Sequence, residues 1–344
     1  MNRAINVTRA PDLAAKVAAL RESSAYPERP AHIEVIETHM SYVFLTPEHV
    51  YKLKKPVRYD YLDFSTLEAR ARNCREELTL NQVLAPGVYL DVVPLATDAQ
   101  GRLALGGTGV PVEWLVKMRR LPAGHILDQR LRSRSATTDE IRRLAEVLAR
   151  FYRDCPPVLT DATTHRADYA RKLKANAAVL ADPRFKLPVE LVAGVCVRLA
   201  RFLDRAGDVF AQRVADGRII DGHGDLRPEH VCLETQPIVF DRLEFNRMFR
   251  LVDTADELAS LSMECERLGA PIVGVELFER YGEATGDRPP DELLHFYAAY
   301  RACLRSRLAI LHTKELAPSA WPRWQALATD YLRLARRHVA WIGK

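Results

Sequence analysis

Short apolar runs rich in β-branched and aromatic residues fill the first third of the chain. They lie at 32–37 (HIEVIE), 41–46 (SYVFLT), 49–54 (HVYKLK), 88–96 (VYLDVVPLA) and 110–118 (VPVEWLVKM). Short runs of this composition between turn residues are typical of antiparallel strands. The pattern therefore predicts a small antiparallel sheet. We interpret the glycine cluster at 106–109 (GGTG), just before the last run, as a hairpin turn.

Two helices are predicted within the same part of the chain. Residues 11–22 place apolar side chains on one helical face and carry Pro11 at the first helical position. Residues 65–87 open with Ser65 and Glu68, which have the spacing of a capping box, and close at an Ala-Pro-Gly sequence. The second helix is thus inserted after the third predicted strand.

Helical periodicity dominates the rest of the chain, and a strand-like island at 218–245 interrupts it. This order predicts an α+β, bilobal architecture with a sheet-rich lobe at 1–118, a connection at 119–123 and a larger helical lobe at 124–344. The predicted helices of the second lobe span 138–154, 165–181, 188–214, 255–268, 272–284, 291–312 and 320–341.

Composition narrows the class of protein. With 48% hydrophobic residues in 344, the chain can bury a sizeable core, and its net charge of +5 is spread along the sequence. That charge gives little support to nucleic-acid binding and suits a polyanionic small ligand equally well. Six dispersed cysteines, the lack of an unbroken apolar segment at the start and the lack of a membrane-length apolar run indicate a cytoplasmic protein that does not enter the membrane.

The stretch HGDLRPEHV, His223 to Val231, carries the most chemistry. Imidazole and carboxylate suit several metals, so His223, Asp225 and His230 alone would be compatible with a metal site. A second carboxylate, Asp241, follows the apolar run PIVF. Two such carboxylates are typical of phosphoryl transfer, in which one orients the attacking hydroxyl and the other holds Mg²⁺.

These segments, 221–232 and 237–246, resemble the catalytic loop and metal-binding segment of the protein-kinase-like fold. The resemblance is strongest to the branch that contains aminoglycoside phosphotransferases and related small-molecule kinases, whose loop reads His-Gly-Asp. It implies that Asp225 positions the acceptor hydroxyl, that Arg227 stabilises charge on the transferred phosphoryl group, and that Asp241 binds Mg²⁺. His230 stands where the family has a metal-binding Asn, and it would be the second metal residue.

The resemblance also implies a strand lysine that contacts ATP phosphates and pairs with a helix glutamate. Lys52 and Lys54 lie on the same face of the run HVYKLK, and Lys54 is preferred. Glu77 is the expected partner, with Glu76 as the alternative. At the predicted hinge strand, the resemblance places Lys117 and Met118 near the nucleotide.

Two departures from the family are visible. An imidazole at His230 is a poorer Mg²⁺ ligand than an amide oxygen. The first hairpin, IETHMSYVF, contains no glycine, so Thr38 and Ser41 are the candidate donors to phosphate there.

A narrower resemblance joins ETHMSYVFLTPEHVYKLKKP, LDFSTLEAR and HGDLRPEH to a bacterial group of uncharacterised phosphotransferase-like proteins. Many of that group carry a further C-terminal P-loop kinase domain, but this sequence has no GxxxxGK[ST]. The expected activity is transfer of the γ-phosphate of ATP, with Mg²⁺, to a hydroxyl of a small molecule. No motif names that acceptor. A nucleotide-binding pseudokinase and a metal-dependent hydrolase that uses His223, Asp225 and His230 remain alternatives.

Overall fold

The computed structural model describes residues 11–98 and 100–343, which form two compact units. The first unit comprises the chain up to Pro122 together with Phe240–Arg247, and the second comprises Ala123–Val239 and the chain from Met248 onward. The break after Pro122 lies inside the connection predicted at 119–123. Residues 240–247 cluster with the first unit, although the sequence had assigned them to the helical lobe.

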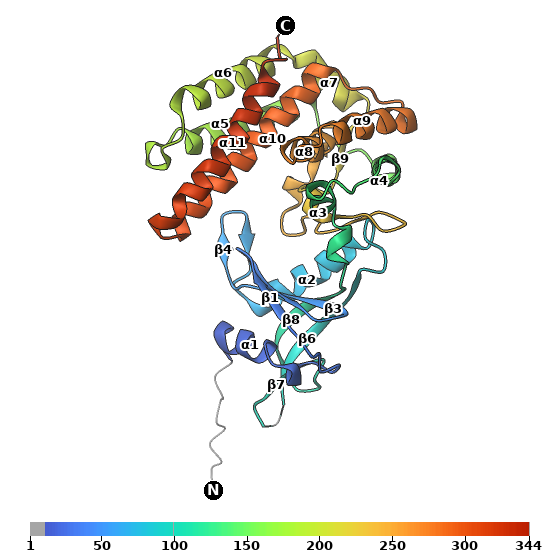
Figure 1. Cartoon of the computed structure of the whole chain (residues 1–344), viewed down its shortest axis with the longest axis vertical. Helices are drawn as coiled ribbons and strands as arrows, with labels where there is room; N and C mark the ends of the chain where they lie inside the picture. Colours follow the sequence, from blue (N-terminus) through green and yellow to red (C-terminus); the bar gives the residue numbers. More distant parts are fainter. Residues whose placement is uncertain (1–10, 99, 344) are drawn as a thin grey trace. The chain divides into compact units, whose positions relative to one another are not determined.

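The first unit contains a six-stranded antiparallel sheet in the order β1-β2-β3-β8-β6-β7 (Figure 1). All of the predicted strand runs are strands. A separate short hairpin, β4 (Arg58–Tyr59) with β5 (Leu62–Asp63), was not predicted. The strands of the main sheet are β1 (Glu34–Glu37), β2 (Ser41–Leu45), β3 (His49–Lys54), β6 (Tyr89–Thr97), β7 (Leu103–Leu105) and β8 (Val110–Arg119).

The glycine cluster at 106–109 does not form a hairpin turn, so that prediction was wrong. Its flanking strands, β7 and β8, do not pair with each other, because both pair with β6 from opposite sides. The cluster therefore connects β7 to β8 past the end of β6. Here a Cβ on Gly109 would lie 1.9 Å from the carbonyl oxygen of Thr97, so the close approach of two backbones requires glycine.

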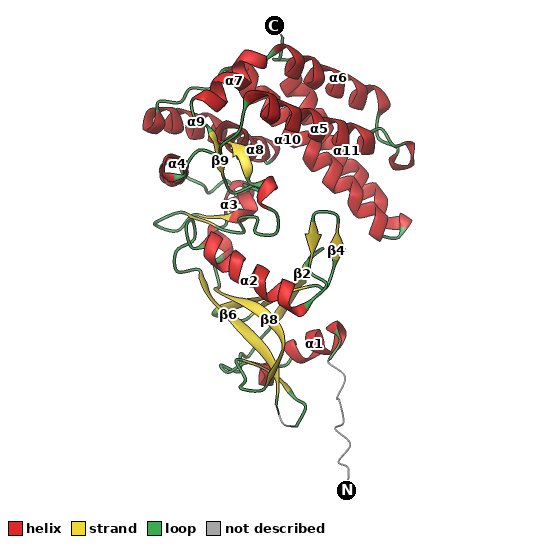
Figure 2. Ribbon diagram, turned by 180° about the vertical axis from the view of Figure 1, so that it is seen from behind, coloured by secondary structure: helices red, strands yellow, loops and turns green. Residues whose placement is uncertain are grey.

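Strand side chains alternate, so both faces of the sheet carry side chains that can pack against a helix. The two helices of this unit lie on opposite faces. Helix α1 (Leu13–Leu20) covers the face that carries Tyr51, Leu53 and Leu115. Helix α2 (Leu67–Asn81) packs along β8 and β6, as Figure 2 shows. The opposite face, beneath α2, carries Lys52 and Lys54 of β3.

The sequence placed the ends of both helices imperfectly. Asp12 caps α1 through its carboxylate, so Pro11 precedes the helix instead of beginning it. Thr66, not Ser65, caps α2 by accepting a hydrogen bond from the Ala69 N–H, while Ser65 binds the carboxylate of Asp63. A hydroxyl caps a helix when it lies within hydrogen-bond distance of the third helical N–H. The Ser65 hydroxyl is bonded to Asp63 instead, which leaves Thr66 in the capping position.

The second unit is mainly helical. The predicted helix 188–214 is divided at Ala206, and the short helix α3 was missed. Its helices are α3 (Leu127–Arg132), α4 (Thr138–Asp154), α5 (Ala162–Leu180), α6 (Val189–Arg205), α7 (Gly207–Ala215), α8 (Thr254–Arg267), α9 (Ile272–Thr285), α10 (Asp291–Leu311) and α11 (Trp321–Val339).

Helix α10 lies at the centre of the second unit and packs against α8, α11, α5 and α6 (Figure 1). Its buried Phe296 and Tyr297 join Tyr169 and Phe210 in one aromatic cluster of the core. Burial on this scale fixes the faces of the helix, so the arginines further along α10 are held in defined positions. No helix among residues 11–98 and 100–343 is long and apolar enough to cross a membrane.

The strand-like island forms two short antiparallel pairs. Strand β9 (Ile219–Asp221) pairs with β12 (Leu251–Asp253), and β10 (Val231–Cys232) pairs with β11 (Ile238–Val239). The motif loop thus begins at the end of β9 and runs through a single 3-10 turn at Pro228–His230 into β10. Both ends of the loop are anchored in strands.

Candidate functional site

A cluster of five charged side chains lies beneath α2 in the first unit. Lys52 donates through Nζ to Glu77 of α2 and to Asp241 of the segment 240–247, each at 2.8 Å. Lys54 donates to the other oxygen of Glu77 and to Glu244, each at 2.5 Å. The strand lysines and the helix glutamate predicted from the sequence are therefore brought together, and Glu77 accepts from both lysines.

The two lysines differ in their access to solvent. The side chain of Lys54 is 1% exposed and that of Glu77 is fully buried, whereas Lys52 is 17% exposed and its partner Asp241 is 39% exposed. A phosphate group can reach an ammonium only where solvent can. The geometry therefore favours Lys52, the alternative residue, over Lys54 as the lysine that would meet a nucleotide.

Opposite charges outweigh the cost of burial in this cluster. Burial by itself lowers the pKa of Lys52, but Asp241, Glu77 and Glu244 raise that pKa well above its usual value. Burial raises the pKa of Glu77, and the two lysines more than reverse this effect. For Glu244, burial dominates and its pKa is raised. Both lysines and Glu77 are thus charged near neutral pH.

The backbone of the segment 240–247 is fixed by hydrogen bonds within the first unit. The Asp241 N–H donates to the Tyr89 hydroxyl at 3.0 Å, and the Arg242 N–H donates to the Asn81 side-chain oxygen at 2.8 Å. Asp241 has a positive φ of 61°, a conformation that is uncommon for residues other than glycine. These contacts hold the Asp241 carboxylate at Lys52.

A buried carboxylate holds the motif loop in the second unit. Glu257 of α8 accepts hydrogen bonds from the backbone N–H groups of His223 at 3.0 Å and Gly224 at 2.7 Å. Gly222 is packed so closely that a Cβ would lie 2.7 Å from Val252 and 2.8 Å from a Glu257 oxygen. Glu257 was not predicted from the sequence. The feature that could have indicated it is an acidic residue in the first turn of the helix that follows LVD in the run LVDTADELA.

His223 supports the loop from inside. Its ring is fully buried, and its Nδ1 accepts a hydrogen bond from the N–H of Asp225 at 3.3 Å.

Asp225 lies among positively charged groups. Arg227 Nε is 3.2 Å from one carboxylate oxygen, and Arg305 of α10 is 3.9 Å from the other. Burial raises the pKa of Asp225, but Arg227, His230 and Arg305 outweigh it and lower the pKa to about 2. The carboxylate therefore stays ionised at any physiological pH, which suits a group that orients a hydroxyl.

The hydrogen bonds of His230 fix its tautomer. Nε2 lies 3.1 Å from an Arg227 nitrogen, and Nδ1 lies 2.9 Å from the carbonyl oxygen of Asp225. Arginine donates only and a carbonyl accepts only, so Nε2 accepts and Nδ1 carries the proton. Both ring nitrogens are thus engaged within the loop. This arrangement does not fit the metal-binding role that the sequence suggested for His230.

The other predicted contact residues are less favourably placed. Ser41 is buried, and its N–H donates to the Thr38 hydroxyl, which in turn donates to the Ser41 carbonyl. Lys117 lies on the same sheet face as Tyr51, opposite Lys52, and its ammonium lies 5.7 Å from the centre of the Tyr51 ring. Met118 pairs with Tyr89 and lies on the face of Lys52. Glu76 is exposed on α2.

The metal chemistry can be tested against the donors that are present. Among the described residues, no group of three or more His, Cys, Asp or Glu side chains could hold a metal ion. His223 is buried and both nitrogens of His230 are hydrogen-bonded, so these two imidazoles do not offer the metal ligands that the hydrolase alternative requires. Asp241 offers the oxygen ligand that Mg²⁺ prefers, and a nucleotide-borne Mg²⁺ needs few protein ligands. Asp241 fits such an ion.

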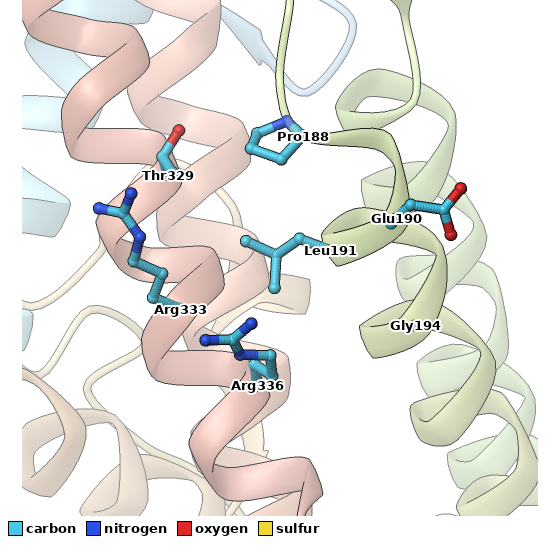
Figure 3. Close-up of a pocket in the computed structure, with 7 residues that line it drawn as sticks. All are labelled: Pro188, Glu190, Leu191, Gly194, Thr329, Arg333 and Arg336. Carbon is cyan, nitrogen blue, oxygen red and sulfur yellow. The ribbon is translucent and has the colours of Figure 1, made fainter.

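A pocket elsewhere in the second unit contains none of these residues. It has a volume of about 390 Å³, and Figure 3 shows it between α6 and α11, with Leu191 on one side and Arg333 and Arg336 on the other. The pocket is shallow and open. Its lining residues include none of the charged side chains described above.

Mycobacterial proteins resemble the chain in sequence. Uncharacterized protein Rv2004c of Mycobacterium tuberculosis (strain H37Rv) is 32% identical over 321 residues, which are 90% of this chain and 62% of that protein. Uncharacterized protein Mb2027c of Mycobacterium bovis matches to the same extent. The chain thus spans about 62% of the length of these relatives. No protein-family model matches the chain.

Solved structures of small-molecule kinases share the fold. The GDP and kanamycin complex of APH(2")-IIia has a TM-score of 0.55 at 15% identity and covers 90% of this chain and 94% of that one. Choline kinase from Cryptosporidium parvum Iowa II has a TM-score of 0.52 at 10% identity, with coverages of 94% and 93%. A choline/ethanolamine kinase family protein from Mesorhizobium loti has a TM-score of 0.50 at 15% identity, with coverages of 94% and 98%.

These likenesses confirm the α+β fold that the sequence predicted. The chain has the protein-kinase-like fold, with an antiparallel sheet in its first part and a mainly helical second part.

Proposed function

We propose that this chain, a protein-kinase-like fold with Lys52 joined to Glu77 and Asp241, is an ATP-dependent phosphotransferase. It moves the γ-phosphate of Mg-ATP to a hydroxyl group of a small molecule. The observation that carries the proposal is this lysine, which is held by a helix glutamate and lies against an exposed carboxylate. Solved neighbours named for GDP, kanamycin and choline support the class of reaction.

Lys52 is the residue that we assign to the nucleotide phosphates. Glu77 fixes the ammonium in place, so little rotamer freedom is lost when phosphate binds. Lys54 is assigned a structural role beside it, because its ammonium is buried between Glu77 and Glu244. Asp241 would hold Mg²⁺, which neutralises charge on the phosphates when bound.

Asp225 and Arg227 act on the acceptor side. The ionised Asp225 carboxylate accepts a hydrogen bond from the acceptor hydroxyl and so directs a lone pair of the hydroxyl oxygen at the γ-phosphorus. The new O–P bond forms as the bond to ADP breaks, and the hydroxyl proton is released as the new bond is completed. With a pKa of about 2, this carboxylate is a weak base, so it positions the hydroxyl more than it deprotonates it. Arg227, now 3.2 Å from Asp225, provides positive charge for the transferred phosphoryl group.

Nucleotide binding and phosphate transfer test the proposal separately. Unfolding temperatures with ATP or GTP, each with and without Mg²⁺, report binding, and a hydroxyl-compound panel followed by product mass reports transfer. Asp225→Asn should retain nucleotide binding and lose at least a hundredfold in transfer. Asp204→Asn, an exposed change on α6, is the matched control. Full turnover by Asp225→Asn would exclude the assigned role.

A nucleotide-binding pseudokinase remains the second candidate because of His230. Its imidazole is tied to Arg227 and to the Asp225 carbonyl, so it supplies no ligand for a second metal ion. His230→Asn would restore the residue that the resembling family has there. Nucleotide binding by the wild type without transfer to any acceptor, together with transfer by His230→Asn, would favour the pseudokinase.

The six cysteines support a cytoplasmic location, which we also propose. None of the six forms a disulfide bond in the structure, and four of them are buried: Cys74, Cys232, Cys265 and Cys303. Free thiols are the usual state in a reducing compartment.

A further inference from the structure

The accessible charge around the Asp225 carboxylate is positive. The side chains of Arg227 and Arg305 are 18% and 22% exposed, and both face this carboxylate. Arg267 of α8 is 22% exposed, as Arg305 is, and both arginines form ion pairs with Glu264. Guanidinium groups at the edge of a binding site attract and orient anions.

Three carboxylates of the neighbouring helix α8 are buried and already occupied. Asp256 accepts both donors of Arg301 at 2.7 and 2.8 Å. Glu257 accepts from the loop backbone, and Glu264 binds Arg267 and Tyr331. All three side chains are nearly inaccessible. None of them therefore offers a negative charge to a ligand at Asp225.

Helix α3 and the 3-10 turn add no net negative charge. Asp128 is nearly buried and makes two hydrogen bonds with Arg132, at 2.9 and 3.0 Å. Glu229 interacts electrostatically with both Arg132 and Arg267. Both carboxylates thus lie near arginines. Beside Asp225, which is itself 32% exposed, the guanidiniums of Arg227 and Arg305 are accessible positive charges.

Arg301 and Arg305, one turn apart on α10, differ in how fully they are used. Arg301 is buried, and its hydrogen bonds to Asp256 have the length of strong charge-assisted bonds. Arg305 makes looser ion pairs, at 3.2 Å to Glu264 and 3.9 Å to Asp225, and its Nε lacks hydrogen-bond geometry to either. Arg305 also interacts with the Tyr331 hydroxyl, but its side chain is 22% exposed and keeps donor capacity for a ligand.

We propose that the phosphate acceptor is an anion, a hydroxyl compound that also bears a phosphate or carboxylate group, and that Arg305 binds this group. The inference rests on the phosphotransferase function proposed above and names its substrate class. Arg227 serves the transferred phosphoryl group, which leaves Arg305 for the fixed charge of the acceptor. The planar fork of arginine matches both phosphate and carboxylate. Kanamycin and choline, named for solved neighbours, are cations and would be repelled here.

Acceptor binding can be measured without nucleotide and without turnover. Calorimetric titration at constant ionic strength would compare glycerol, choline, glycerate, glycerol 3-phosphate and inorganic phosphate. We expect glycerol 3-phosphate or glycerate to bind at least tenfold more tightly than glycerol or choline. The two anionic compounds distinguish a phosphate from a carboxylate. Tighter binding of choline, or equal binding of the charged and neutral compounds, would overturn the inference.

Substitutions locate the anion at Arg305. Arg305→Met should remove the tenfold preference, and Arg305→Lys, which keeps the charge and the contact with Glu264, should retain part of it and guards against a folding defect. Arg333→Met, an exposed arginine paired with Asp330 on α11, is the matched control and should retain all of it. Lys52→Met should also retain it, which excludes binding at the nucleotide lysine. An unchanged preference in Arg305→Met would contradict the assignment.

Anion binding at Arg305 and phosphate transfer are measured separately, so each can fail without the other. If anions bind at Arg305 but no acceptor receives phosphate and no nucleotide binds, the phosphotransferase proposal fails while the anion site stands. If transfer occurs to cationic or neutral acceptors in preference to anionic ones, the reaction stands and the substrate class is wrong.

Discussion

Replacing Lys54 with methionine separates the structural lysine from the one assigned to the nucleotide. The change removes an ammonium that is 1% exposed and leaves Glu77 and Glu244 buried at 0% and 7% exposure. Breaking a buried ion pair by removing one partner costs about 3–5 kcal/mol. Lys52→Met should cost less, about 1–2 kcal/mol, because Asp241 is exposed enough to be hydrated and Glu77 keeps Lys54.

Urea unfolding followed by circular dichroism measures both costs, with Lys55→Met as the control on the adjacent residue. The loss for Lys54→Met should be smaller at pH 5 than at pH 8. Burial already raises the pKa of Glu244, so below that pKa the carboxyl is neutral and needs no cation. Adding Glu244→Leu to Lys54→Met should recover much of the loss, since Glu77 then retains Lys52 and no unpaired charge is buried.

Nucleotide binding should show the reverse order: Lys52→Met costs less stability than Lys54→Met but should lose more binding. Lys52→Met should abolish the rise in unfolding temperature with Mg-ATP, while the rescued double variant should still bind nucleotide. If Lys54→Met were no less stable than Lys52→Met, or if only Lys54→Met lost nucleotide binding, the assignment of the two lysines would be reversed.

Further predictions concern the motif loop. Gly222→Ala should destabilise the second unit by about 1–3 kcal/mol, because its Cβ would clash with Val252 and Glu257, whereas Gly194→Ala, which meets open space inside α6, should be neutral or stabilising in urea titrations. Glu257→Gln should lower both unfolding temperature and turnover, because an amide nitrogen cannot accept from the loop N–H groups. The folded pKa of Asp225, about 2, is below the ordinary 3.8, so its contribution to stability is present above 3.8 and is lost as pH falls toward 2; Asp225→Asn should unfold with a weaker pH dependence in that window.

The periodic features of the chain were predictable because local patterns determine them. Five of the six strands of the main sheet and most helices follow from alternation and from 3.6-residue periodicity. The connectivity at 106–109 was not predictable in the same way. Whether β7 pairs with β6 or β8 depends on contacts between strands distant in sequence, and a glycine cluster is compatible with both.

The charged cluster shows why the site was only partly predictable. Because strand side chains alternate, Lys52 and Lys54 were expected on one face of the sheet, and both therefore lie near α2. Alternation cannot determine which of the two ammonium groups is covered. Glu244 decides this: it lies three residues after Asp241 and occupies Lys54, which leaves the exposed Asp241 to Lys52. Its contribution was invisible in the sequence because the pair joins residues 190 positions apart. The same segment that carries the candidate metal ligand therefore also selects the lysine, and this makes Glu244 the residue whose loss would most directly free Lys54 for a nucleotide.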